Sequence, residues 1–248
     1  MTATVILEAR GLVIRFGGVV AADGIDLDVH AGENLAIIGP NGAGKTTFLN
    51  MATGYLRPQA GSVRFLGSDI TAHPPREITR LGIARAFQIP QLFLEQTVIE
   101  NMLIAAASRE RAMGGLRSLL ARPEREEMMG LLELVGVRAT ADRKARELPE
   151  GQRKLVDIAL ALALKPKLLL MDEPTSGVAS SEKSAVMDIL TRALARRAVT
   201  SVFVEHDMEM VERYATRVAV WSSGRIQKVG SPADVFSDPA VIQQVIGI

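Results

Sequence analysis

The feature that most constrains this chain is a glycine-rich stretch, GPNGAGKTT, which runs from Gly39 to Thr47. The apolar run Leu35-Ala-Ile-Ile38 comes before it, and Phe48-Leu-Asn-Met-Ala-Thr53, a segment typical of a helix, comes after it. The pattern G-x-x-x-x-G-K-[ST] forms a phosphate-binding loop when it stands in this order of strand, turn and helix. With Gly at about 7% of residues, chance gives the pattern in roughly one chain of this size in a hundred. The stretch therefore predicts nucleotide binding.

Each residue type in the stretch has a physical reason to be there. Gly39, Gly42 and Gly44 lack a Cβ, so the backbone can turn tightly and aim its N–H groups at one point. The helix that follows turns its partly positive N-terminus toward the same point. Lys45 adds a full positive charge for the β- and γ-phosphates, and the Thr46 hydroxyl is suited to ligate Mg²⁺.

Composition narrows the class of protein. The 248 residues suffice for one large domain or two small ones, and 48% hydrophobic with 23% charged residues is the profile of a soluble globular protein. The net charge of +1 gives no bulk electrostatic case for nucleic acid or an anionic membrane surface. Because cysteine is absent, disulfides and thiol chemistry are excluded. No apolar run approaches about 18 residues, so another chain would have to supply any membrane span.

Two kinds of strand are expected. Near the N-terminus, short glycine-bounded strands predict an antiparallel arrangement, and Pro74 and Pro75 mark an ordinary loop. In the last third, fully apolar strands alternate with helices, which predicts a parallel sheet covered on both faces. The expected strands are 5–9, 11–16, 25–29 and 61–67, then 167–171, 200–204 and 217–221, with an amphipathic helix at 181–197.

From about residue 95 to 150 the sequence changes character. Runs of helix formers, such as 100–107 and 125–135, dominate this part, with breaks at 113–115 and at 122–123. We expect a helical subdomain inserted into the α/β core.

Polar residues follow two of the apolar strands. Asp172 and Glu173 end the strand 167–171, and His206 caps the strand 200–204. Ligands of parallel sheets bind at the carboxyl ends of strands. In proteins with a phosphate loop, an acid there holds Mg²⁺ and the next acid can polarise water. Gln88 lies just before the helical segment, where the junction of two subdomains distinguishes it from an ordinary surface glutamine.

Together these motifs resemble the ATP-binding cassette (ABC) ATPases over nearly the whole chain. In family order they are the Walker A loop 39–47, the Gln88 loop, the signature-like 148–152 (LPEGQ), the Walker B strand 168–173, the turn 174–179 and His206. Within the family the chain is most similar to ATP-binding subunits of branched-chain amino acid importers and related amide or urea importers. That similarity lies in 15–18, 23–24, 97–101, 205–208, 230–232, 238–242 and 246–247.

The resemblance implies an α/β fold with a RecA-like P-loop NTPase core, an antiparallel β subdomain and an inserted α-helical subdomain. Residues 1–248 would form one nucleotide-binding domain. The core and β subdomain would occupy 1–94 and 151–248, and the helical subdomain about 95–150.

The resemblance also assigns roles. Phe16 would stack on adenine, with a place in the core as its alternative. Glu173 would be the general base, and His206 would contact the γ-phosphate. Thr46, Gln88 and Asp172 would organise Mg²⁺, the last through water, and Gly151 would approach the nucleotide of a second cassette. The phosphates of ATP would be held by Gly39, Asn41, Gly42, Ala43, Gly44, Lys45, Thr46 and Thr47.

Cassettes of this family close head to tail over two nucleotides. The implied partners are a second ABC ATPase subunit, in a homodimer or a heterodimer, transmembrane permease subunits and, indirectly, a solute-binding protein. The implied location is peripheral, on the cytoplasmic side of the cell membrane.

Two departures from the family pattern stand out. The family signature usually begins Leu-Ser-Gly-Gly, but Pro149 and Glu150 replace its second and third residues, so a serine hydroxyl that would bond the partner's γ-phosphate is missing. Proline is tolerated in the first turn of a helix, so a helix over 150–164 is still expected. Glu150 would bring a negative charge near that phosphate. Ala179 replaces a polar residue of the D-loop. We predict weaker engagement of the partner's ATP, which suggests pairing with a different cassette.

Three other functions fit parts of the sequence. The first is the ATPase of an exporter or a lipid-extraction system. The second is a non-transport ABC protein of translation or DNA maintenance, against which stand the single cassette, the lack of zinc-ligand cysteines and the absence of a basic excess. The third is a regulatory ATP-binding module, favoured by Pro149 and Ala179 and opposed by the intact Lys45, Asp172 and Glu173.

Overall fold

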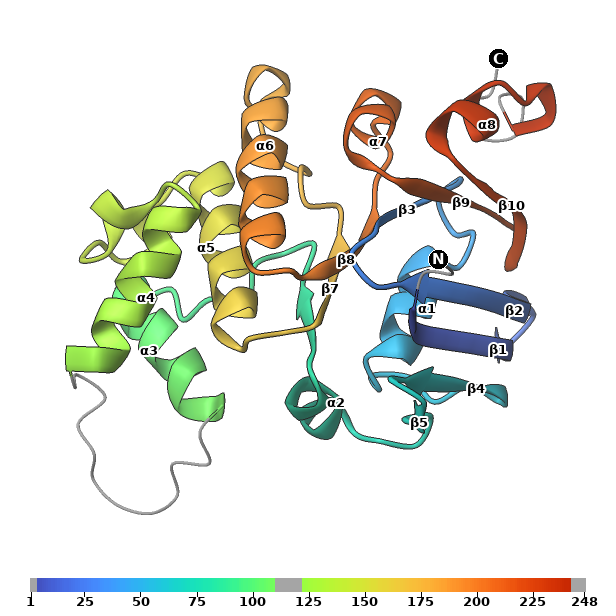
Figure 1. Cartoon of the computed structure of the whole chain (residues 1–248), viewed down its shortest axis with the longest axis horizontal. Coiled ribbons are helices and arrows are strands. Elements are labelled where there is room, and N and C mark those ends of the chain that lie inside the picture. The colour runs from blue at the N-terminus through green and yellow to red at the C-terminus, as the bar shows by residue number, and fades with distance from the viewer. Residues whose placement is uncertain (1–3, 110–121, 242–248) are drawn as a thin grey trace.

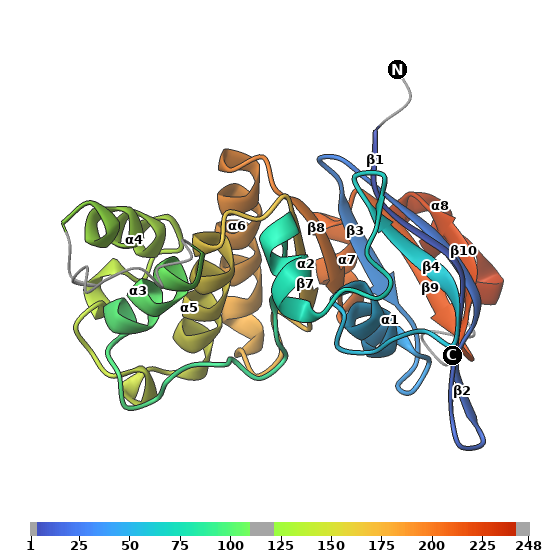
Figure 2. The same ribbon diagram turned by 90° about the horizontal axis from the view of Figure 1, so that it is seen from below.

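The computed structural model describes residues 4–109 and 122–241. It places a group of helices at one end of the molecule, a six-stranded sheet in the middle and an antiparallel sheet near the other end (Figure 1). Figure 2 shows the same order from below. No helix within the described ranges is long and apolar enough to cross a membrane.

The six-stranded sheet has the order β10-β9-β3-β8-β7-β6 and is parallel except at one edge. Its parallel strands are β3 (Asn34–Ile38), β6 (Ile83–Ala86), β7 (Leu168–Asp172), β8 (Thr200–Val204) and β9 (Arg217–Ser222). β10 (Arg225–Gly230) pairs with β9 in the antiparallel direction. The apolar strands expected in the last third are therefore confirmed as neighbours in one parallel sheet.

Alternate side chains of these strands enter two separate cores. Ile38, Met171 and Phe203 belong to the core beneath α5 (Glu150–Ala163), α6 (Ser180–Arg196) and α7 (Met208–Tyr214). Ile37 and Leu170 belong to the opposite core, which α1 (Lys45–Ala52) and the antiparallel sheet cover. Because both faces are covered, strands such as β7 and β8 are buried at every residue.

The antiparallel sheet has the order β2-β1-β4-β5. Its strands are β1 (Val5–Phe16), β2 (Val19–His30), β4 (Ala60–Phe65) and β5 (Ser68–Asp69). The expectation of separate strands at 5–9 and 11–16 is wrong, because β1 continues through an irregularity in register between Ala9 and Leu12. Gly11 takes a positive φ of 59° there, which lets the strand absorb the irregularity instead of ending.

The helical end of the molecule contains α3 (Val98–Arg109), α4 (Arg122–Leu134) and α5, which pack on one another. Two short 3-10 turns, Arg138–Thr140 and Ala145–Glu147, connect α4 to α5. α5 also contacts β6 and α6, so this helix joins the helical end to the sheet. The predicted break at 113–115 and the family-like residues 242 and 246–247 lie outside the described residues.

A short helix replaces the loop expected around Pro74 and Pro75. Pro74 is the N-cap and Pro75 the first residue of α2 (Pro75–Leu81). A proline at the first helical position loses no hydrogen bond and has a suitable φ, so these two prolines begin a helix. α8 (Pro232–Phe236) begins in the same way after Ser231.

Candidate active site

The glycine-rich stretch forms a loop between β3 and α1. Gly39 and Gly44 are required by close approach: a Cβ on Gly39 would lie 2.0 Å from the carbonyl oxygen of Trp221, and one on Gly44 would lie 1.9 Å from that of Ala21. Both residues have positive φ, 145° and 102°. Only glycine fits these positions, so the loop conformation follows directly from the motif.

Lys45 is folded back into the loop. Its Nζ donates to the carbonyl of Gly39 at 2.7 Å and to that of Pro40 at 2.9 Å. Burial lowers the pKa of Lys45, while the nearby charges of Glu173 and Asp172 act in the opposite direction. The ammonium group is thus held against two backbone carbonyls of the loop.

A cavity of about 270 Å³ opens over this loop. Its lining combines the loop, the start of β2 and the two strand ends that the sequence singled out: Phe16, Val19, Ala21, Asn41, Gly42, Ala43, Gly44, Lys45, Thr46, Thr47, Glu173, Val204 and His206. Phe16 is 48% exposed, which rules out the alternative that it is a core residue. The cavity therefore has an exposed aromatic ring at one side and polar groups at the other.

Asp172 ends β7 and is 4% exposed. Its Oδ1 lies 3.3 Å from the Thr46 hydroxyl, and its Oδ2 accepts from Nη2 of Arg85 at 3.1 Å. The Arg85 side chain is only 6% exposed and also stacks on Phe87, 4.7 Å from the ring centroid. Burial lowers the pKa of Arg85, and the charge of Asp172 opposes that shift. Sequence reasoning did not single out Arg85, since a lone arginine in a strand has no distinguishing spacing.

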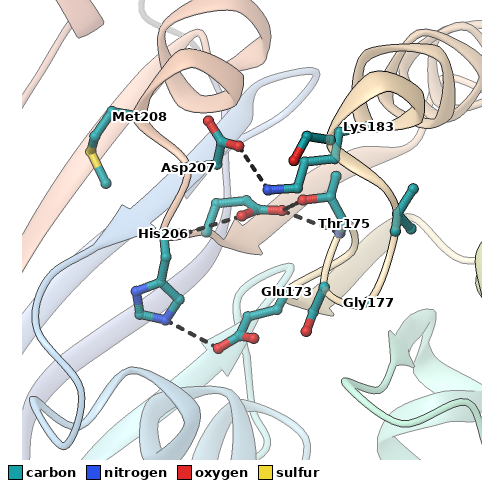
Figure 3. Close-up of a pocket in the computed structure, with 11 residues that line it drawn as sticks. Glu173, Thr175, Gly177, Lys183, His206, Asp207 and Met208 are labelled. Atoms are coloured by element: carbon teal, nitrogen blue, oxygen red, sulfur yellow. Dashed lines mark hydrogen bonds and ion pairs between the residues drawn. The ribbon is translucent and has the colours of Figure 1, made fainter.

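Glu173 collects the other predicted residues. Its Oε2 accepts from Nε2 of Gln88 at 2.9 Å. Its Oε1 lies 3.1 Å from Nε2 of His206, and Figure 3 shows these two side chains. Its backbone has a positive φ of 52°, unusual for a residue with a side chain, and its N–H donates to the carbonyl of Val204 at 3.0 Å. Gln88, Glu173 and His206 follow β6, β7 and β8, so three residues that were predicted separately meet at one carboxylate.

Glu205 connects the turn after Glu173 to the backbone of His206. Its buried carboxylate accepts from the N–H and hydroxyl of Thr175, at 3.2 and 2.5 Å, and from the N–H of His206 at 3.1 Å. These residues line a second cavity, of about 690 Å³, which Figure 3 shows. The sequence analysis placed Glu205 in the family-like residues 205–208 but gave it no role, although a charged residue directly after a buried strand was the available signal.

The signature-like segment lies apart from the nucleotide cavity. Pro149 caps α5, which begins at Glu150 and ends at Ala163, so the expected helix is confirmed. Gly151 does not line the cavity over the phosphate loop. A Cβ on Gly177 would lie 2.2 Å from Oε1 of Glu150, so the Glu150 carboxylate lies against the turn that follows Glu173.

Comparison with known proteins agrees with this geometry. The family model of the ABC transporter matches residues 22–176. The chain is 35% identical, over 98% of both chains, to the high-affinity branched-chain amino acid transport ATP-binding protein BraF of Pseudomonas aeruginosa. It is 38% identical, over 98% of this chain and 97% of the relative, to the probable branched-chain amino acid transport ATP-binding protein LivG of Methanocaldococcus jannaschii.

A solved structure extends the likeness to three dimensions. The crystal structure of an ATP-binding cassette of an ABC transporter, in its ADP conformation, superposes with a TM-score of 0.86 at 35% identity and covers 99% of this chain and 100% of that one. The predicted fold class, with its P-loop core, antiparallel β subdomain and inserted helices, is confirmed. The chain therefore belongs to the ABC transporter family, as one of its ATP-binding cassettes, the ATPases of that family.

Proposed function

We propose that this cassette hydrolyses ATP to power an importer of branched-chain amino acids or related small polar solutes. One observation carries the catalytic part: the Glu173 carboxylate, held between Gln88 and His206, faces the cavity above the phosphate loop. The names of the two relatives described above support the importer and its solute class.

In this proposal the loop from Gly39 to Thr47 binds the phosphates through its N–H groups and Lys45, and Phe16 stacks on adenine. The exposed ring of Phe16 at the rim of the cavity supports that role. Asn41 lies in the same lining, and we assign its backbone to the binding of the phosphates.

The residues present fit a Mg²⁺ ion. The Thr46 hydroxyl and Oδ1 of Asp172 lie 3.3 Å apart, and Mg²⁺ is commonly held by only one or two protein oxygens, with waters and phosphate oxygens as its other ligands. No group of three histidine or acidic residues suited to a metal occurs in the described part of the chain, which accords with such a site. When bound, Mg²⁺ neutralises charge on the β- and γ-phosphates. We assign Thr46, Asp172 and Gln88 to its surroundings.

Glu173 is the proposed general base. Its Oε1 and Oε2 are each engaged by one neighbour, which fixes the plane of the carboxylate toward the cavity. A water beside the γ-phosphate would give its proton to this carboxylate as its oxygen attacks the γ-phosphorus, and the bond from that phosphorus to the β–γ bridging oxygen would break, so that ADP leaves. His206 would orient the base and contact the phosphate.

The proposed partners are a second ABC cassette and the permease subunits of the importer, with a solute-binding protein acting on the permease. Near Gln88 the surface exposes Ile89 (73%), Phe93 (59%) and Leu94 (47%). The exposed ring of Tyr55 lies edge-on to Phe87, next to Gln88. An exposed apolar patch of this kind favours a docked protein partner. We place the cassette peripherally on the cytoplasmic side of the membrane, with the helical subdomain at about 95–150 and Gly151 directed to the second cassette.

The exporter, non-transport and regulatory alternatives are tested together by purification of the tagged chain from native membranes in detergent. If the chain belongs to an importer, polytopic permease subunits and a second cassette should copurify with it. A different second cassette would also support the heterodimer hypothesis. Recovery with ribosomal or nucleic-acid proteins, or with export components, would reject the importer. Loss of turnover in Glu173→Gln with ATP binding retained separates an active ATPase from a regulatory module.

A further inference from the structure

Two buried charged side chains lie one turn apart on α5. Lys154 is 2% exposed and Asp157 is 6% exposed, although the rest of the buried face of this helix is mainly apolar. α5 stands between the outer helices and α6 in both views (Figures 1 and 2). Buried lysine and aspartate are rare unless polar partners compensate for the loss of water. Their partners all belong to the region of Gln88 and Glu173.

Asp157 holds both ends of the segment that contains Gln88. Its Oδ2 accepts from the N–H of Phe87 at 3.1 Å, and its Oδ1 accepts from the N–H of Gln91 at 3.3 Å. One carboxylate therefore fixes the backbone immediately before Gln88 and three residues after it.

Lys154 holds Gln88 and Glu173 together through their backbones. Its Nζ donates to the carbonyl oxygen of Gln88 and, at 3.2 Å, to the carbonyl oxygen of Glu173. The side chains of these two residues meet at 2.9 Å. The ammonium group thus closes a ring that joins the two residues through both backbone and side chain.

The backbone of Glu173 needs such support. A residue with a side chain at a φ of 52° is in a sparsely populated region, which persists only where neighbouring contacts determine it. The Glu173 carbonyl accepts from Lys154 and from the N–H of Ser176 at 3.1 Å. The contact with Lys154 is assisted by charge and is the stronger of the two kinds.

We propose that Lys154 is a positioning residue for hydrolysis, which sets Gln88 and Glu173 in register from the side of the helical subdomain, and that Asp157 anchors the segment on which Gln88 stands. The inference rests on the roles proposed above for Glu173 and Gln88. Lys154 does not line the nucleotide cavity. Its removal should therefore lower turnover and leave ATP affinity unchanged.

The test compares Lys154→Met with wild type in the full chain, by phosphate release at saturating Mg-ATP and by equilibrium binding of ATP. Methionine keeps an unbranched apolar chain, one atom shorter than that of lysine, and removes all three donors. We expect kcat to fall by about tenfold or more while the Kd for ATP stays within about twofold. Lys154→Gln, which can still donate to one carbonyl, should fall between the two. Lys144→Met is the control, because that side chain is 43% exposed and pairs with the exposed Glu95 at 3.6 Å.

A double variant separates positioning from a general structural role. If Lys154 acts through Gln88, then Lys154→Met added to Gln88→Ala should lower kcat by much less than the product of the two single effects. Three results would each overturn the proposal. They are multiplicative effects in the double variant, a kcat of Lys154→Met within twofold of wild type, and parallel losses of kcat and ATP affinity. If Lys154→Met does not fold, Lys154→Gln and Lys154→Arg decide on the same criteria. Glu173→Gln is measured beside them: if it retains turnover, the assigned base is wrong, whereas an inactive Glu173→Gln with an unaffected Lys154→Met rejects the role of Lys154 alone.

Discussion

Arg85→Met is the substitution whose cost follows most directly from the structure. The guanidinium of Arg85 and the carboxylate of Asp172 pair at 3.1 Å, and their side chains are only 6% and 4% exposed. Methionine keeps the apolar stem but leaves Asp172 as a buried charge without its cation. Removing one partner of a buried ion pair costs about 3–5 kcal/mol, because the remaining charge stays desolvated. We expect the free energy of unfolding at neutral pH to fall by about that amount.

Arg146→Met provides a matched control. Arg146 pairs with Glu95 at 2.7 Å, closer than Arg85 to Asp172, but the two side chains are 52% and 65% exposed. An exposed pair contributes at most about 1 kcal/mol. The comparison therefore isolates burial, because the shorter contact should have the smaller effect.

Urea unfolding of both variants, followed by circular dichroism, measures the difference. Adding Asp172→Asn to Arg85→Met removes the unpaired charge and should restore part of the lost stability. If Arg85→Met and Arg146→Met lose the same free energy of unfolding, the reasoning from burial is refuted. If the added Asp172→Asn lowers stability further, the loss in Arg85→Met comes from packing and not from an uncompensated charge.

Three further predictions concern activity and pH. Glu173→Gln should lower turnover by about 10²–10⁴-fold with ATP binding intact, measured by phosphate release and nucleotide binding, and persistent turnover would contradict the assigned base. Burial raises the pKa of Asp157 to about 6 from 3.8, so ionisation of this carboxyl penalises the folded state as pH rises through that range. Between pH 4 and 7 the wild type should lose about 2 kcal/mol of unfolding free energy relative to Asp157→Asn in urea unfolding, and a constant difference would count against that shift. Pro149→Ser should increase ATPase activity and ATP-driven dimerisation, measured by phosphate release and light scattering, and no change in either would reject the predicted weakness of the signature.

The residues of the site that could be predicted are those that belong to a short continuous sequence pattern. The phosphate loop is a continuous motif, and Asp172, Glu173 and His206 each follow an apolar strand. Because carboxyl ends of parallel strands share one edge of the sheet, these residues had to meet there. The structure places Glu173 and His206 3.1 Å apart from positions 33 residues distant in sequence.

The residues that sequence reasoning missed act through partners far along the chain. Arg85 and Asp172 are 87 positions apart, and Lys154 meets Gln88 from 66 positions away. A single charged residue in a strand or helix carries no spacing that reveals a distant partner. The same limit explains Pro74 and Pro75, because a proline pair is compatible with a loop and with the start of a helix, and only the chain after it decides.

Pro149 and Glu150, which depart from the family signature at the start of α5, differ in how far the structure supports an effect on a second nucleotide. The Glu150 carboxylate lies against Gly177, whose missing side chain leaves the room for it. Its charge is thus directed toward the turn after Glu173 in its own chain, which weakens the case that Glu150 repels the phosphate of a second nucleotide. Pro149 stands at the N-cap of α5 without a side-chain cap, where a serine would both cap the helix and present a hydroxyl. We therefore attribute the predicted weak engagement of a second nucleotide to Pro149, so Pro149→Ser should change dimerisation more than Glu150→Gly does.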